Sequence, residues 1–156
     1  MIKAEKSVVI DRPIEDVFDF VGDQRNGPRW QAGLTEVRRL TDGPPGLGTR
    51  HTIVRTFLGR RMEADNEYIA FEPGKLITFR TTSGPMPLEA SYLVEPAAGG
   101  TKLTSRIEMH AAGFVSLAEP LIARGLRREM NAALTKLKGL LEASASTAAT
   151  SIPAAQ

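Results

Sequence analysis

The sequence contains no cysteine, so the chain forms no disulfide, no thiolate zinc site and no cysteine nucleophile. Long apolar runs are missing as well, since none approaches the roughly 18 residues that a membrane-spanning helix requires. Residues 1–6 are not followed by the apolar segment of a secretory signal. We therefore expect a cytoplasmic protein of bacterial type without integral membrane association.

An excess of charge of one sign is also absent. The 20 basic and 18 acidic residues leave a net charge of +2, and both signs are interspersed along the chain. This pattern argues against a nucleic-acid-binding stripe. The one local cluster, Arg124, Arg127 and Arg128, is typical of a solvated helix face.

Motifs for cofactors and metals are lacking too. The sequence has no metal-ligand spacing and no Ser-His-Asp arrangement. The Gly- and Pro-rich segment 43–48 lacks the strand–turn–helix context that phosphate binding requires. We expect no metal and no cofactor.

What is present fits one globular domain. Of the 156 residues, 42% are hydrophobic and 24% are charged, which is enough apolar material for a single core. We assign this domain to residues 1–142 and expect a monomer or homodimer. Residues 143–156 carry no charge and have little to bury, so they are predicted to form a disordered tail.

Residues 116–142 are predicted to form one long amphipathic helix. Its apolar positions recur at steps of three and four: Ala118, Leu121, Ile122, Gly125, Leu126, Met130, Ala133, Leu134, Leu137, Leu140 and Leu141. Even a helix of this length is marginal in water by itself, so another part of the chain must cover this stripe. We expect Leu134, Leu137, Leu140 and Leu141 to anchor the helix, and Leu121, Ile122, Leu126 and Met130 to form one wall of a cavity.

The rest of the chain predicts two short helices and seven strands. Residues 3–10 form a first strand, and Pro13 opens a short helix with apolar residues at 14, 17, 18 and 21. A short helix or turn is expected around Trp30, then a strand at 35–40. Residues 48–110 show strands separated by turn signals, at the spacing of an antiparallel meander.

The turns of this meander predict its register. We take Gly59-Arg60, Pro73-Gly74, Gly84-Pro85 and residues 97–100 as turns. The resulting inner pairs are Phe57 with Met62, Arg55 with Ala64, Ile53 with Asn66, His51 with Tyr68, Tyr68 with Phe79, Asn66 with Thr81, Phe79 with Ala90, Ile77 with Tyr92, Tyr92 with Ser105, Ala90 with Ile107, and Leu88 with Met109. On the outer face Glu67 opposes Arg80, Arg80 opposes Glu89 and Glu95 opposes Lys102, whereas Glu89 opposes Glu108. The mostly apolar inner face is the predicted partner of the helix.

This order of elements resembles the helix-grip fold of the START/Bet v 1-like (SRPBCC) superfamily, and more narrowly its polyketide cyclase/dehydrase branch. The matching segments are residues 10–13 (IDRP) with 17–18 (VF), 28–30 (PRW), 48–50 (GTR), 72–73 (EP) leading to 79–80 (FR), 83–85 (SGP), 100–103 (GTKL) and 137–142 (LKGLLE). The resemblance implies an α+β fold with a seven-stranded curved antiparallel sheet around the C-terminal helix and a hydrophobic cavity open at one end. Members variously bind lipids, hormones or quinones, or cyclise or aromatise polyketides.

The inner face carries more polar residues than a plain core would hold: His51, Arg55, Asn66, Tyr68, Thr81, Tyr92 and Ser105. Buried polar groups require partners, so they suggest either a ligand or pairing among themselves. In the second case His51 bonds Tyr68, Arg55 reaches out of the cavity or meets a carboxylate, Asn66 pairs with Thr81, and Tyr92 pairs with Ser105.

Three functions remain open. The first is binding of a small or medium hydrophobic molecule, such as a lipid or polyketide, in the cavity. The second is a polyketide cyclase or dehydratase in which Arg55 holds an oxygen, His51 moves protons and Tyr68 orients His51. The third is a protein-interaction module. The predicted ligand-binding residues are Trp30, His51, Ile53, Arg55, Phe57, Asn66, Tyr68, Phe79, Leu88, Tyr92, Ile107, Met109, Leu121, Ile122, Leu126 and Met130.

Overall fold

A computed structural model describes residues 1–57, 59–110 and 117–150, with the side chains of these residues apart from those of residue 57 and residues 145–150. The elements in chain order are β1 (Ile2–Ile10), α1 (Ile14–Gly22), the 3₁₀ helix η1 (Gln24–Arg29), β2 (Leu34–Arg39), β3 (Arg50–Phe57), β4 (Arg60–Glu72), β5 (Leu76–Ser83), β6 (Leu88–Ala97), β7 (Gly100–Met109) and α2 (Glu119–Thr150). The predicted α+β helix-grip architecture is confirmed, including its seven strands and the two short helices after β1.

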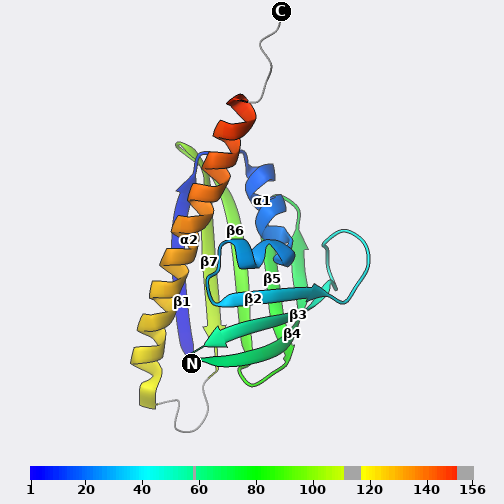
Figure 1. The fold of residues 1–156 in the computed structure, drawn as a ribbon, viewed down its shortest axis with the longest axis vertical. Helices are drawn as coiled ribbons and strands as arrows, with labels where there is room; N and C mark the ends of the chain where they lie inside the picture. The colour runs from blue at the N-terminus through cyan, green and yellow to red at the C-terminus, as the bar shows by residue number, and fades with distance from the viewer. Residues whose placement is uncertain (58, 111–116, 151–156) are drawn as a thin grey trace, which may run out of the picture.

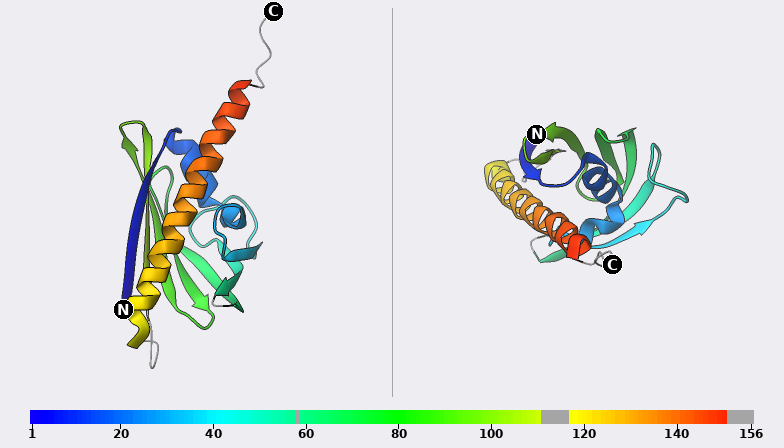
Figure 2. Two further views of the ribbon diagram at one scale, coloured as in Figure 1. Left: turned by 60° about the vertical axis from the view of Figure 1, so that its left-hand side comes forward. Right: turned by 90° about the horizontal axis from the view of Figure 1, so that it is seen from above.

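All seven strands form one antiparallel sheet in the order β1-β7-β6-β5-β4-β3-β2. The strands from β2 to β7 are the predicted meander, and each pairs with its neighbour in sequence. The first strand crosses to the far edge and pairs with β7, from Ile2 opposite Met109 to Ile10 opposite Thr101. The sheet curves strongly, and α2 runs along its concave side next to β1 (Figures 1 and 2).

The predicted register is confirmed from β4 to β7. Tyr68 faces Phe79, Phe79 faces Ala90, and Tyr92 faces Ser105. The like-charge pair Glu89 opposite Glu108 is also present. Glu108 faces Lys3 on its other side, at 3.5 Å between Oε1 and Nζ, so the charge of Glu108 is balanced by β1.

The predicted register between β3 and β4 is wrong by two residues. Phe57 faces Arg60, Arg55 faces Met62 and Ile53 faces Ala64, whereas the predicted partners were Met62, Ala64 and Asn66. Gly59 has φ +75°, a conformation that glycine adopts without strain. Because a shift of two residues preserves the alternation of side chains, each residue keeps its predicted face of the sheet.

The C-terminal part of α2 is tied to the segment that follows β1. The Arg12 guanidinium donates to the Leu141 carbonyl at 2.6 Å, and the Asp11 backbone N–H donates to Glu142 Oε2 at 2.9 Å. Lys138 donates to the Val9 carbonyl at 2.6 Å. These hydrogen bonds hold the helix beside the first strand and fix its position along the sheet.

The helix differs from its predicted bounds at its C-terminal end. It continues to Thr150, so residues 143–150 of the predicted tail are helical, while residues 151–156 lie outside the described residues. Residues 143–150 are rich in alanine, the strongest helix former, and adding a residue to an existing helix avoids the cost of nucleation. The predicted start at Ser116 also lies outside the described residues.

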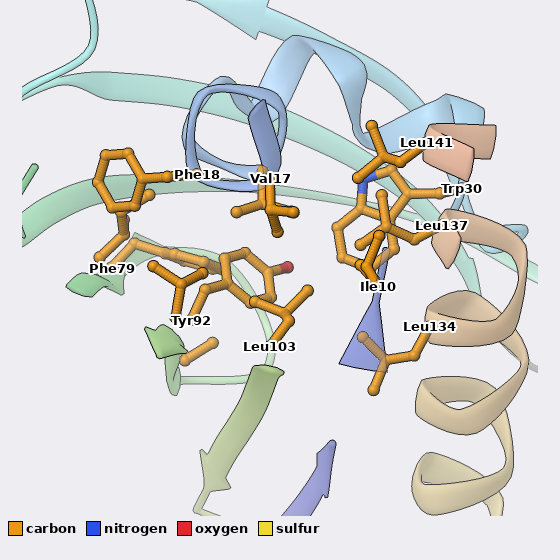
Figure 3. Packing of buried hydrophobic residues seen from close by; sticks show 14 of the residues in the cluster. Ile10, Val17, Phe18, Trp30, Phe79, Tyr92, Leu103, Leu134, Leu137 and Leu141 are labelled. Carbon is orange, nitrogen blue, oxygen red and sulfur yellow. The ribbon is translucent and has the colours of Figure 1, made fainter. Parts of the chain in front are cut away.

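The core fills the space between α2, α1 and the sheet. Ile10, Leu103 and Leu137 are fully buried, and Leu134 and Leu141 are nearly so. Figure 3 shows Trp30 gathered with Leu137 and Leu141 of α2, which belong to the same buried cluster as Val17 and Phe18 of α1. The leucines predicted to anchor the helix therefore do so, whereas Leu121 is 73% exposed.

The unequal burial of the α2 leucines predicts unequal effects of truncation. Leu137→Ala leaves a cavity in the core and should lower the free energy of unfolding by about 2–5 kcal/mol, measured by urea denaturation. Leu121→Ala is the control on the same helix and should change it by less than about 0.5 kcal/mol. Equal losses in the two variants would contradict this packing.

Candidate functional site

A cavity of about 320 Å³ lies between the inner face of the sheet and the middle of α2. Its floor comes from β3 to β7, one wall from the segment after η1 that begins at Trp30, and another wall from α2 between Leu126 and Lys136. Most of its lining side chains are apolar. The alternation of side chains along each strand places these residues on the concave face, opposite the charged outer face.

Ten of the sixteen residues predicted to bind a ligand line this cavity: Trp30, Ile53, Arg55, Phe79, Leu88, Tyr92, Ile107, Met109, Leu126 and Met130. Five others lie elsewhere: His51, Asn66, Tyr68, Leu121 and Ile122. The side chain of the remaining residue, Phe57, lies outside the described residues. The cavity therefore occupies the half of the sheet toward the ends of β3 and β7 rather than its whole inner face.

A polar group stands inside this apolar lining. Arg55 donates from Nη2 to Gln31 Oε1 at 2.9 Å, and Gln31 donates from Nε2 to Tyr92 Oη at 3.3 Å. The Tyr92 ring packs against Trp30, with ring centroids 5.7 Å apart. Gln31 thus connects β3 to β6 across the cavity wall. Within the described part of the chain, Arg55 forms no ion pair with a carboxylate. Tyr92 likewise forms no hydrogen bond with Ser105.

Burial changes the titration of both ionisable members of this group. It lowers the pKa of Arg55 by disfavouring the charged guanidinium, against the opposing interactions with Tyr92 and Glu129. It raises the pKa of Tyr92 to about 12. At neutral pH the cavity therefore contains an arginine cation and a neutral phenol, both of which are hydrogen-bond donors.

His51 lies outside the cavity and is completely buried. Arg39 donates from Nε to His51 Nε2 at 3.4 Å, and Nδ1 has no hydrogen-bond partner. Its ring lies 5.5 Å from that of Tyr68, but the predicted bond between them is replaced by one from Tyr68 Oη to the Gly22 carbonyl at 2.7 Å. Burial, and next the charge of Arg39, lower the pKa of His51 from 6.5 to about 4.

The structure does not bring His51 and Arg55 together. Both project from the inner face of β3, but residues four apart on a strand are separated by about 13 Å. Arg55 lines the cavity, whereas His51 packs beside Arg39 and Tyr68. The paired roles considered for these two side chains require one substrate atom within reach of both, and this geometry does not provide such a position.

Gln31 is the residue that sequence reasoning missed. It follows Trp30 in the turn after η1, where no alternation or helical period ranks side chains by burial. Its position beside an expected buried tryptophan was the only available signal. Asn66 also has an unforeseen partner, because its Nδ2 donates to Gln24 of η1 at 3.0 Å, while Thr81 bonds the Leu88 backbone.

The curved sheet, the long helix on its concave side and the apolar cavity between them define a helix-grip fold. Residues 1–142 match the model of the family described as polyketide cyclase / dehydrase and lipid transport. The chain belongs to this family.

Comparison with known proteins adds relatives at low identity. An uncharacterised protein of Mycobacterium tuberculosis is 28% identical over 122 residues, which cover 73% of this chain and 71% of that protein. A START superfamily protein from Mycobacterium smegmatis has a TM-score of 0.75 at 13% identity, covering 91% of this chain and 98% of that one. The di-domain ARO/CYC StfQ from the steffimycin biosynthetic pathway has a TM-score of 0.77 at 14% identity, covering 93% of this chain and 52% of that one. At these identities the two solved structures establish the fold alone.

Within residues 1–57, 59–110 and 117–150, no helix combines the length and the apolar character that crossing a membrane requires.

The buried neutral His51 predicts that stability falls with acidification. Its pKa is 6.5 when unfolded and about 4 when folded, so between these values the unfolded chain binds the extra proton. His51 should therefore destabilise the fold progressively as the pH drops from about 6.5 to 4, by up to about 3 kcal/mol. Urea denaturation at pH 7 and pH 4.5 measures this loss.

Comparison with His51→Gln isolates the histidine from the other titrating groups. The variant should lose clearly less stability than the wild type over this interval. The exposed His110, replaced in the same way, is the matched control. An identical pH dependence in wild type and His51→Gln would contradict the burial of a neutral imidazole.

Proposed function

We propose that this protein binds a small or medium hydrophobic molecule, of the lipid or polyketide kind, in the cavity between the sheet and α2. The observation that carries the proposal is the cavity itself, about 320 Å³ in volume and lined mainly by apolar side chains. Transfer of apolar surface from water into such a site is favourable, and apolar pockets with a few polar groups are the usual form of small-molecule sites.

The volume of the cavity suggests the size of its guest. A protein cavity of about 150 Å³ is known to hold benzene, so about twice that volume has room for a two-ring molecule or a chain of similar size. Met130, Met86, Met62 and Met109 are among the lining residues. Their flexible thioether side chains can adapt to guests of different shape.

The guest has a route from solvent beside α2. Glu129, Ala132 and Lys136 line the cavity and are also exposed on the helix, so they mark the place where it reaches water. Two charged side chains at this mouth keep it hydrated, while the apolar walls lie further inside.

Filling the cavity should abolish binding. Ala133→Phe places an aromatic ring in the cavity from α2, and we expect the displacement of a fluorescent hydrophobic probe, 1-anilinonaphthalene-8-sulfonate, by 1-naphthol to be lost. Thr135→Phe puts the same ring on the exposed side of this helix and should leave the affinity within about twofold, since it touches no cavity wall.

Both variants should first be shown to be folded by circular dichroism. Equal binding by wild type and Ala133→Phe would place the probe outside this cavity, and absence of any binding by the folded wild type would contradict the proposed function.

The second candidate is a cyclase or dehydratase acting on a poly-β-keto chain. Membership of the family and the cationic Arg55 inside the cavity favour it. The guanidinium has five donors and uses one of them on Gln31, so it could stabilise an enolate oxygen. Its weakness is the position of His51, which leaves the cavity without a side chain that exchanges protons near neutral pH within the described residues.

Product analysis separates the two candidates. A binding protein should leave the products and rate of cyclisation of a poly-β-keto thioester unchanged from those in buffer. An acceleration that disappears in a folded Arg55→Ala variant would show the enzyme instead.

The third hypothesis, a protein-interaction module, predicts one large exposed apolar patch. In the part of the chain that the structure describes, the large exposed apolar side chains come from the start and end of β1, the β2–β3 loop and the start of α2. This distribution does not favour that hypothesis.

A further inference from the structure

A second, much smaller chamber adjoins the ligand cavity. It has a volume of about 20 Å³ and shares six lining residues with the cavity: Trp30, Gln31, Ile53, Arg55, Phe79 and Tyr92. Its other side is formed by Val21 of α1, Asp23, Gln24 and Gly27 at η1, Leu34 of β2 and Asn66 of β4. The Asp23 carboxylate already accepts hydrogen bonds from Arg25 and Arg39. About 10–15 Å³ is enough for one water-sized group, so the chamber holds one such group and not a larger one.

Asn66 leaves an unanswered hydrogen-bond acceptor at this chamber. The residue is 2% exposed, and its Nδ2 donates to Gln24 Oε1 at 3.0 Å. Its Oδ1 has no partner. A buried amide oxygen without a partner costs free energy, so a group that donates a hydrogen bond to it would be stabilised there.

Donors also reach this chamber. Arg55 lines it and has unused N–H groups beyond the one bonded to Gln31. Tyr92 accepts its hydrogen bond from Gln31, which leaves its own O–H free to donate. One side of the chamber therefore supplies hydrogens and Asn66 supplies a lone pair.

Few chemical groups satisfy both sides. A hydroxyl donates its hydrogen to Asn66 and accepts hydrogen bonds from Arg55 and Tyr92. A carbonyl or carboxylate oxygen would satisfy Arg55 but would bring a second acceptor to Asn66, and a carboxylate has two oxygens for a space the size of one. A methyl group would fill the space and leave the Asn66 Oδ1 acceptor and the unused donors of Arg55 and Tyr92 without partners.

We propose that this chamber is a hydroxyl subsite of the ligand cavity, in which Asn66, Arg55 and Tyr92 bind an O–H group at one end of an otherwise hydrophobic ligand. The inference rests on the proposed function and adds the chemical class of the ligand: an apolar alcohol or phenol rather than an acid or a hydrocarbon.

Two matched probes test the subsite. We would measure the Kd of 1-naphthol and of 1-methylnaphthalene by calorimetry for wild type and for Asn66→Leu, which keeps the size of the side chain and removes its amide. The Kd of 1-naphthol should rise about tenfold in the variant, as expected for one lost hydrogen bond to a buried group, while that of 1-methylnaphthalene should stay the same or fall.

Two further variants make the result specific. Tyr92→Phe removes only a hydroxyl and should also weaken 1-naphthol relative to 1-methylnaphthalene, so the test survives if Asn66→Leu fails to fold. Ser91→Ala, on the outer face of the same strand, should leave both Kd values unchanged, because Ser91 lines neither space and bonds Thr78.

The outcomes separate the two proposals. If both probes bind and their Kd ratio is the same in wild type, Asn66→Leu and Tyr92→Phe, the subsite is overturned, and the chamber holds only a structural water while the cavity still binds ligands. If neither probe nor any other apolar compound binds the folded wild type, the proposed function fails and the subsite fails with it.

Discussion

The structure depends on one strongly held segment of α2. From Leu134 to Glu142 the helix buries its leucines against the core and bonds the segment after β1 through Arg12 and Lys138. Nearer the start of α2, Met130 is buried, and an exposed ion pair joins the Met1 amino group to Glu119 at 3.1 Å. Such exposed pairs contribute little. Between the inner face of the sheet and α2 from Leu126 to Lys136 a space remains, and that space is the cavity.

Arg55 and Tyr92 place polar groups in this cavity without disrupting the fold, because both form a hydrogen bond with Gln31. Gln31 accepts from Arg55 and donates to Tyr92, so its amide uses both ends. The remaining donors of Arg55 and the hydroxyl hydrogen of Tyr92 stay available, and Asn66 retains a free acceptor. Buried polar groups with unused hydrogen-bonding capacity cost free energy in a core that excludes water. Their position beside a cavity therefore supports the proposal that a ligand binds there.

Alternation of side chains was enough to predict much of this fold from the sequence. It gave the inner face and the register from β4 to β7, and the turn glycines separated the strands. The β3–β4 pairing was wrong by two residues, since sequence alone does not fix the turn that Gly59 makes, yet a shift of two residues preserves the alternation along the strand. The sequence could not show which inner-face residues line the cavity, because this depends on where α2 packs against the sheet. Hence Arg55 and Tyr92 line it, while His51 and Tyr68, on the same face, do not. Gln31 lies in a turn, where no alternation or helical period indicates which side chains are buried, so its place in the cavity wall could not be predicted.

Native mass spectrometry of the protein purified from cells that express it tests the central claim most directly. The account predicts that part of the folded protein carries a bound molecule of low mass, that denaturation releases this molecule, and that Ala133→Phe purified in parallel carries none. Wild-type protein that retains no small molecule and acquires none from a mixture of apolar alcohols, with a crystal structure in which the cavity is closed, would contradict the claim that this fold holds a ligand between its sheet and α2.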